Sequence, residues 1–178
     1  GEKGSAENVR KIFADLKKTG SNDDFVLVVL LGHGTYDGEV AKFNLVGPDL
    51  TAKDWTSLLA GVQGRVAIVN TTEASFPFLE SLTAKGRVVI TATDSAAQKY
   101  ATVFPEYFVK AIREASTDLD KNGRTSLFEV FSAASASLRS ERRGTLRLDQ
   151  TVGLLSIGEV LDGGVQRRGF RTSATSIP

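Results

Sequence analysis

Residues 25–34 read FVLVVLLGHG, and this stretch decides the fold that the sequence predicts. Seven apolar residues run without a break from Phe25 to Leu31, between a pair of aspartates and Gly32. An apolar run of this length, rich in Val and Leu, is typical of a strand that is buried on both faces. Such strands lie in the middle of parallel sheets that helices cover. The stretch therefore predicts an α/β fold with residues 25–31 as an inner strand.

A single histidine, His33, follows this strand between two glycines, and the chain has no other histidine. In open α/β sheets, ligands and chemistry gather just beyond the carboxyl ends of the strands. Imidazole is the side chain that most readily takes up and releases a proton near neutral pH. His33 is therefore the first candidate for an active-site residue.

Strands and helices alternate along the rest of the chain. Short apolar runs bounded by turn signals predict strands, and apolar residues at helical spacing predict helices. The predicted strands are 65–70, 87–93 and 151–157, with a β-ribbon at 35–46; the predicted helices are 6–18, 51–59, 75–84, 104–115 and 126–142. Alternation of this kind means βαβ units. We expect a three-layer α/β/α sandwich with a mostly parallel central sheet.

The bulk composition limits the classes of function. A length of 178 residues fits one domain, and we expect residues 1–164 to form it, followed by a mobile basic tail at 165–178. The net charge of +1 gives no electrostatic reason to expect nucleic acid as a partner. No apolar run approaches the ~20 residues of a membrane span. The absence of cysteine excludes disulfides, thiolate metal ligands and a cysteine nucleophile.

The order of the predicted elements leaves one edge of the sheet open. The chain opens on a helix, so the strand at 25–31 would have an uncovered edge. We expect an upstream segment of the native protein or a second chain to cover it. Because the chain also lacks an initiator Met, we expect it to be a fragment, a mature form or an excised domain.

A second polar turn follows the predicted strand at 65–70. It reads NTTEAS at residues 70–75, and it would meet His33 at one rim of the sheet if the two strands are neighbours. A nucleophile on one loop and a histidine on the next is a minimal hydrolase arrangement. The hydroxyl candidates are Thr35, Thr71, Thr72 and Ser75, and the acidic candidates for a third member are Asp37, Glu39, Glu73 and Asp94. The alternative is that these hydroxyls satisfy backbone groups in a tight turn.

These segments resemble the caspase, metacaspase and legumain superfamily. LLGHGTYDGEVAKFNLVGPDLT (30–51), RVAIVNTTEASFPFLESL (65–82) and GRVVITAT (86–93) are similar to bacterial caspase-like proteins, and the resemblance covers roughly residues 6–135. It implies that His33 of the His33-Gly34 pair is a general base or acid. It places Thr72, or Glu73 if the register shifts by one residue, where the family has its cysteine nucleophile. The resemblance also implies a caspase-like fold that lacks the first strand–helix unit.

The sharpest local motif is DLDKNGRTSLFE at residues 118–129. It fits the twelve-residue EF-hand-like calcium loop without a gap, and one departure is Thr125, where a larger aliphatic residue is usual. The predicted ligands are the side chains of Asp118, Asp120, Asn122, Ser126 (directly or through water) and Glu129, with the backbone carbonyl of Arg124. Because all of these are oxygen ligands, the motif predicts calcium as cofactor. The alternative is a turn between two helices that binds nothing.

Three functional hypotheses follow. The first is a caspase-like or legumain-like peptidase homologue without activity, a pseudoenzyme that serves as a binding, regulatory or structural module clipped by calcium. The second is a working peptidase or other hydrolase that uses Thr72 or Ser75 with His33. The third is a vestigial His33 rim that contacts another domain of a longer chain. The calcium loop favours an exported protein, periplasmic or extracellular, over a cytoplasmic one.

Overall fold

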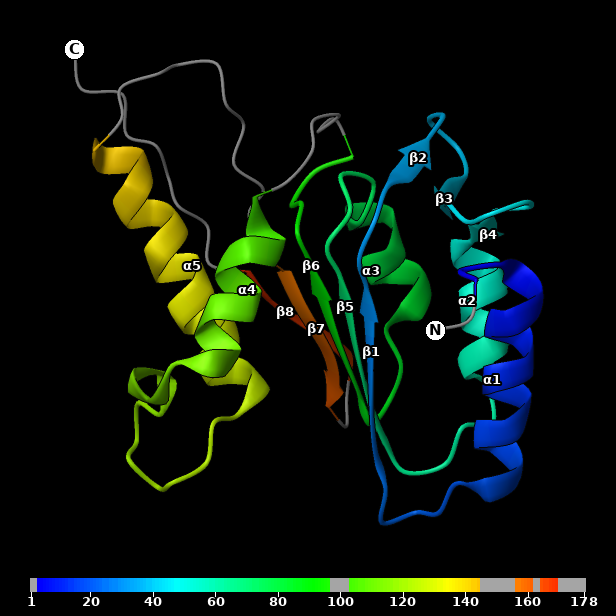
Figure 1. Cartoon of the computed structure of the whole chain (residues 1–178), viewed down its shortest axis with the longest axis horizontal. Helices are drawn as coiled ribbons and strands as arrows, with labels where there is room; N and C mark the ends of the chain where they lie inside the picture. Colours follow the sequence, from blue (N-terminus) through cyan, green and yellow to red (C-terminus); the bar gives the residue numbers. More distant parts are fainter. Residues whose placement is uncertain (1–2, 97–102, 145–155, 162–163, 170–178) are drawn as a thin grey trace.

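A five-stranded sheet forms the centre of the molecule (Figure 1). The computed structural model describes residues 3–96, 103–144, 156–161 and 164–169. Within these residues the strand order is β1 (Phe25–Leu30), β5 (Arg65–Asn70), β6 (Arg87–Thr91), β7 (Ser156–Leu161) and β8 (Gly164–Gly169). The first three run parallel, whereas β7 is antiparallel to β6 and β8 is antiparallel to β7. The fold is therefore mixed α/β around a parallel three-stranded core, as the alternation of strands and helices predicts.

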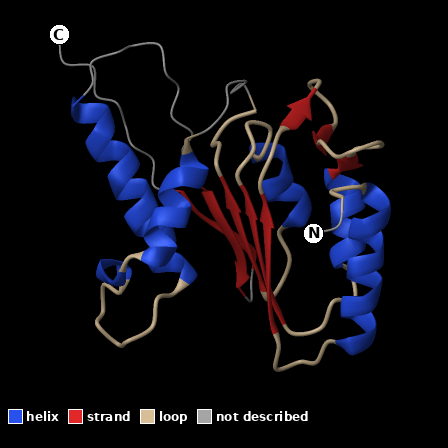
Figure 2. Cartoon of the chain, viewed as in Figure 1, coloured by secondary structure: helices blue, strands red, loops and turns tan. Residues whose placement is uncertain are grey.

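Helices lie on both faces of this sheet (Figures 1 and 2). One face carries α1 (Ala6–Thr19), α2 (Ala52–Leu59) and α3 (Phe76–Leu82), and the other carries α4 (Phe104–Arg113) and α5 (Leu127–Gly144). Successive strand residues point to opposite faces. Ile68 and Val89 accordingly join the apolar cluster of α1–α3, and Val69 and Ile90 join that of α4 and α5. No helix within the described residues has the length and apolar character of a membrane span.

The strand β1 lies at the edge of the sheet, which corrects the prediction of an inner strand buried on both faces. Among the described strands it pairs with β5 alone, and Phe25 and Leu27 are 54% and 40% exposed. The middle strand of the three parallel strands is β5, whose residues from Val66 to Asn70 are all buried. An apolar run shows that both faces of a strand are apolar but not that anything covers them. The open edge expected for this strand is present in the described part of the chain.

The C-terminal region differs from the predicted strand and tail. The strand expected at 151–157 is described only from Ser156 onward, as β7, and residues 151–155 lie outside the described residues. Residues 165–169 of the predicted mobile tail belong to β8, which pairs with β7. Residues 170–178 lie outside the described residues. The sheet thus continues past β6 as an antiparallel hairpin.

A second, small sheet follows the carboxyl end of β1. It consists of β2 (Gly34–Tyr36), β3 (Ala41–Phe43) and β4 (Leu50–Thr51), in antiparallel pairs. β2 and β3 form the ribbon predicted at 35–46. Asp37 holds the turn between them, because its Oδ1 accepts the N–H groups of Glu39 and Val40 at 3.0 and 2.7 Å. These hydrogen bonds, first that of Val40, lower the pKa of Asp37.

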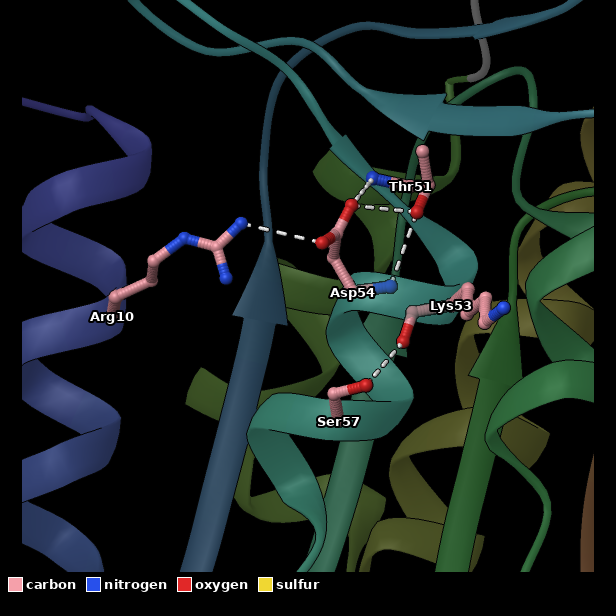
Figure 3. Close-up of polar contacts among 5 residues, drawn as sticks. All are labelled: Arg10, Thr51, Lys53, Asp54 and Ser57. Atoms are coloured by element: carbon pink, nitrogen blue, oxygen red, sulfur yellow. Dashed lines mark hydrogen bonds and ion pairs between the residues drawn. The ribbon is translucent and has the colours of Figure 1, made fainter.

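The start of α2 is fastened by one carboxylate, that of Asp54 (Figure 3). Thr51 Oγ1 accepts the Asp54 N–H at 3.1 Å, and Asp54 Oδ2 accepts the Thr51 N–H at 3.0 Å, which is the capping box that a Thr followed three residues later by an Asp indicates in the sequence. Arg10 of α1 donates to Asp54 Oδ1 at 3.2 Å. The pKa of Asp54 is lowered, mainly by the hydrogen bond from the Thr51 side chain. Asp54 therefore both caps α2 and ties it to α1.

Candidate functional site

The loops that follow β1 and β5 meet at one rim of the sheet. The two strands are parallel neighbours, and the last residue of β1, Leu30, pairs with the last residue of β5, Asn70. Beyond these ends, His33 Nδ1 lies 3.3 Å from Glu73 Oε1. The structure therefore brings the predicted histidine and the predicted polar turn together, as neighbouring parallel strands require.

His33 is a surface residue that Glu73 orients. The His33 side chain is 76% exposed, and that of Glu73 is 20% exposed. Because an ionised carboxylate only accepts hydrogen bonds, we assign the proton to His33 Nδ1, which leaves Nε2 as the acceptor of the neutral ring. The exposed ring of His33 therefore offers Nε2 as a hydrogen-bond acceptor.

Thr72, where the resemblance to the caspase superfamily predicts the nucleophile position, lies beneath the chain at Gly34. It is 1% exposed, and its Oγ1 makes no hydrogen bond to any described residue. A Cβ atom placed on Gly34 would stand 2.6 Å from that oxygen. The Thr72 N–H donates to Asn70 Oδ1 at 3.1 Å. The hydroxyl is thus neither accessible nor in contact with a base, and the structure does not assemble a His33–Thr72 dyad.

Two of the other hydroxyl candidates, Ser75 and Thr71, are occupied by contacts that hold the rim together. Ser75 Oγ lies 2.9 Å from Thr93 Oγ1 and accepts the Thr93 N–H at 3.1 Å. Thr71 Oγ1 donates to the Leu30 carbonyl at 2.8 Å and joins β1 to β5. The satisfaction of backbone groups therefore accounts for Ser75 and Thr71. Sequence reasoning missed Thr93, although its place just past the end of β6 puts it at the same rim.

The predicted calcium loop lies between α4 and α5, after the short 3₁₀ helix η1 (Ala115–Thr117). Asp118 accepts the N–H groups of Asn122 and Gly123 at 3.1 and 2.8 Å. Gly123 adopts a φ of 80°, in the left-handed region that glycine favours. Ligand atoms of Asp118, Asp120 and Glu129 all lie within 4.8 Å of one another. Three carboxylates predicted to bind a metal are therefore gathered at one point.

Glu129 is the buried member of this group, with 6% of its surface exposed. Its Oε2 accepts both the N–H and the hydroxyl of Ser126 at 2.7 Å, and Ser126 Oγ accepts the Glu129 N–H at 3.3 Å. Its Oε1 accepts the N–H groups of Leu119 and Asp120 at 2.9 and 3.3 Å. The hydrogen bonds with Ser126, followed by those of Leu119 and Asp120, lower the pKa of Glu129 to about 2. Its carboxylate is therefore charged at neutral pH.

The remaining predicted ligands form local contacts. Asn122 Nδ2 donates to Asp120 Oδ2 at 2.8 Å, and Asn122 Oδ1 accepts the Arg124 N–H at 2.8 Å. The side-chain donor set of Asp118, Asp120, Asn122, Ser126 and Glu129 contains oxygen atoms and neither sulfur nor imidazole. Such a set suits a hard divalent cation and by itself does not select calcium.

No protein-family model and no curated protein match the chain. The resemblance of residues 30–51 and 65–82 to the caspase superfamily therefore remains a prediction.

Proposed function

We propose that this chain is a caspase-like or legumain-like peptidase homologue without peptidase activity, a binding or structural domain whose 118–129 loop takes calcium. The observation that carries the proposal is the contrast between Thr72 and His33 at one rim. Thr72 Oγ1 is buried without a hydrogen bond to any described residue, and the Nδ1 atom of the exposed His33 is held by Glu73. The predicted nucleophile position is therefore occupied by Thr72, which has no thiol and no base among the described residues in hydrogen-bond contact with its hydroxyl.

The chemistry of acyl transfer explains why this geometry favours an inactive domain. An alkoxide nucleophile forms only when a base within hydrogen-bond reach takes its proton. Thr72 Oγ1 has no such base, and the Ser75 hydroxyl is occupied by Thr93. The alternative hydrolase would therefore need a rearrangement of the turn at 70–75 before any bond could be attacked.

An assay with fluorogenic peptides tests this proposal. The substrates carry Asn, Asp, Arg or Lys before the cleaved bond, and His33→Ala is the control. We expect no hydrolysis by the wild-type chain or by Thr72→Cys, because position 72 is 1% exposed. Hydrolysis by the wild type that disappears in His33→Ala would establish the active hydrolase instead. Activity gained by Thr72→Cys would show that the rim lacks only a thiol.

The proposed calcium site consists of Asp118, Asp120 and Glu129 with the oxygens of Asn122, Arg124 and Ser126. The bound cation would neutralise carboxylates whose ligand atoms already lie within 4.8 Å of one another. Ligands that bind the folded state alone raise its stability. A calcium-dependent rise in melting temperature, larger than that with magnesium, supports the site; an unchanged melting temperature with EDTA and no heat on titration would discard it. A loop of this kind suits a compartment rich in calcium, which is why we propose an exported protein.

The edge of β1 is the proposed place for a partner. Two apolar side chains of this strand, Phe25 and Leu27, are exposed. Unpaired strand edges readily add another strand through main-chain hydrogen bonds. An upstream segment of a longer protein, or a second chain, would pair with the open edge of β1. A peptide or protein partner bound at this edge would extend to the His33 rim. If a second chain or a partner pairs with β1, we expect Leu27→Lys to weaken oligomer formation or partner binding. The size of that loss measures how much the β1 edge contributes.

A further inference from the structure

One side chain, Glu129, connects the two ends of the 118–129 loop. Its Oε1 accepts the N–H groups of Leu119 and Asp120, which lie at the start of the loop. Its Oε2 receives the N–H and the hydroxyl of Ser126, at the start of α5. Glu129 thus holds together residues that are separated by the whole turn.

The Glu129 carboxylate is held through both of its oxygen atoms. It receives four donors, two on each oxygen. Hydrogen bonds to a charged group are among the stronger ones in proteins. Glu129 as a whole residue is also only 6% exposed, and burial limits competition from water. Glu129 therefore joins the two ends of the loop through hydrogen bonds between protein groups.

We propose that Glu129 is a clasp that forms the α4–α5 connection independently of any cation. The clasp also caps α5, because Ser126 Oγ accepts the Glu129 N–H. A cation would then bind to a loop that is already closed, and it would add stability without switching the helices between two arrangements. This last consequence rests on the calcium function proposed above, whereas the clasp itself does not.

Thermal unfolding of the full chain in EDTA tests the clasp. We compare the wild type with Glu129→Gln and with the matched control Glu106→Gln. Glu106 lies in the first turn of α4, as Glu129 does in α5, but its carboxylate makes no hydrogen bond to the described residues. We expect Glu129→Gln to lower the melting temperature in EDTA by about 4–8 °C, and Glu106→Gln by about 1 °C or less. Equal effects of the two substitutions in EDTA would overturn the proposal.

Hydrogen exchange of the wild type provides a readout that does not depend on how well the variant folds. In EDTA, we expect the Leu119 and Asp120 amides to be protected, with little further protection on adding calcium. Amides that exchange freely in EDTA and become protected only with calcium would overturn the clasp while supporting the calcium site. Protection in EDTA with no calcium effect in any assay would support the clasp and reject the calcium site.

Discussion

The rim at His33 and the loop at 118–129 both collect polar groups, but they satisfy them in opposite ways. At the rim, Thr72 Oγ1 and Asn70 Nδ2 are buried and make no hydrogen bond to the described residues. In the loop, the buried Glu129 carboxylate receives four donors. A buried polar group without a partner costs about 1–3 kcal/mol. The rim thus lowers the stability of the fold, whereas the loop does not. This difference is a reason to propose that the rim serves to contact a partner and that the loop serves to stabilise the fold.

The largest expected effect is the loss of the calcium response in Asp120→Asn. The amide keeps an oxygen that can accept the Asn122 N–H, which now bonds to Asp120 Oδ1 at 3.1 Å, but it removes a charge from the proposed site and gives up the exposed contact of Asn122 Nδ2 with Asp120 Oδ2. At a hundredfold excess of calcium over its dissociation constant, the wild type should gain about 2.7 kcal/mol. Asp120→Asn should lose most of this gain and change little in EDTA.

The comparison with Glu129→Gln makes this prediction specific. That substitution should act already in EDTA, whereas Asp120→Asn should act mainly with calcium. Melting curves of both variants with and without calcium separate a ligand from a clasp. If calcium raises the melting temperature of Asp120→Asn as much as that of the wild type, Asp120 is not a ligand of the proposed site.

The next effect concerns the close packing at the rim. A Cβ atom on Gly34 would meet Thr72 Oγ1 at 2.6 Å and both Ala74 Cβ and the Lys42 carbonyl at 3.1 Å. We expect Gly34→Ala to lower the free energy of unfolding by about 2 kcal/mol, within the usual range for overpacking. The double variant Gly34→Ala/Thr72→Ala should recover part of this loss, because it removes the nearest atom. Chemical denaturation measures the free energy of unfolding of each variant. If the effects of Gly34→Ala and Thr72→Ala simply add in the double variant, the two residues do not share this contact.

A smaller effect, of opposite sign, is expected for the Thr72 hydroxyl. Thr72→Val keeps the shape of the side chain and removes a buried group without a partner, so it should raise the free energy of unfolding by about 1–2 kcal/mol. Thr71→Val is the matched control, because its hydroxyl donates to the Leu30 carbonyl and its loss should cost about 1 kcal/mol. If both substitutions destabilise, Thr72 Oγ1 has a partner in solution, and the cost assigned to the rim is wrong.

The features predicted from sequence are those formed by residues close together in the chain. The Thr51–Asp54 box and the loop from Asp118 to Glu129 depend on contacts within one or two turns, which a linear pattern can show. The contact of Ser75 with Thr93 and the burial of Thr72 under Gly34 depend on which strands become neighbours. The edge position of β1 depends on what covers an apolar face, and a single strand does not contain that information. For this reason the gathering of Asp118, Asp120 and Glu129 was predictable and the state of the rim hydroxyls was not.

The smallest effect belongs to the Thr51–Asp54 capping box, which repeats the Ser126–Glu129 arrangement at a more exposed position. The pKa of Asp54 lies below its ordinary value of 3.8, chiefly because of the Thr51 side chain. A lowered pKa stabilises the fold above the ordinary value, and this contribution is lost as the pH falls through the lowered one. Asp54→Asn should therefore cost about 0.5–1 kcal/mol at pH 7 and progressively less below pH 3.8.

Arg10→Ala separates the cap from the ion pair in this cluster. Arg10 and Asp54 are 53% and 33% exposed at the side chain, so their pair should contribute only about 0.5 kcal/mol and should weaken with salt. Denaturation of both variants at low and high salt distinguishes the two parts, because the capping hydrogen bonds are local and should persist. A cost of Asp54→Asn that disappears in high salt would assign its role to Arg10, and the analogy with the Glu129 clasp would then fail at this position.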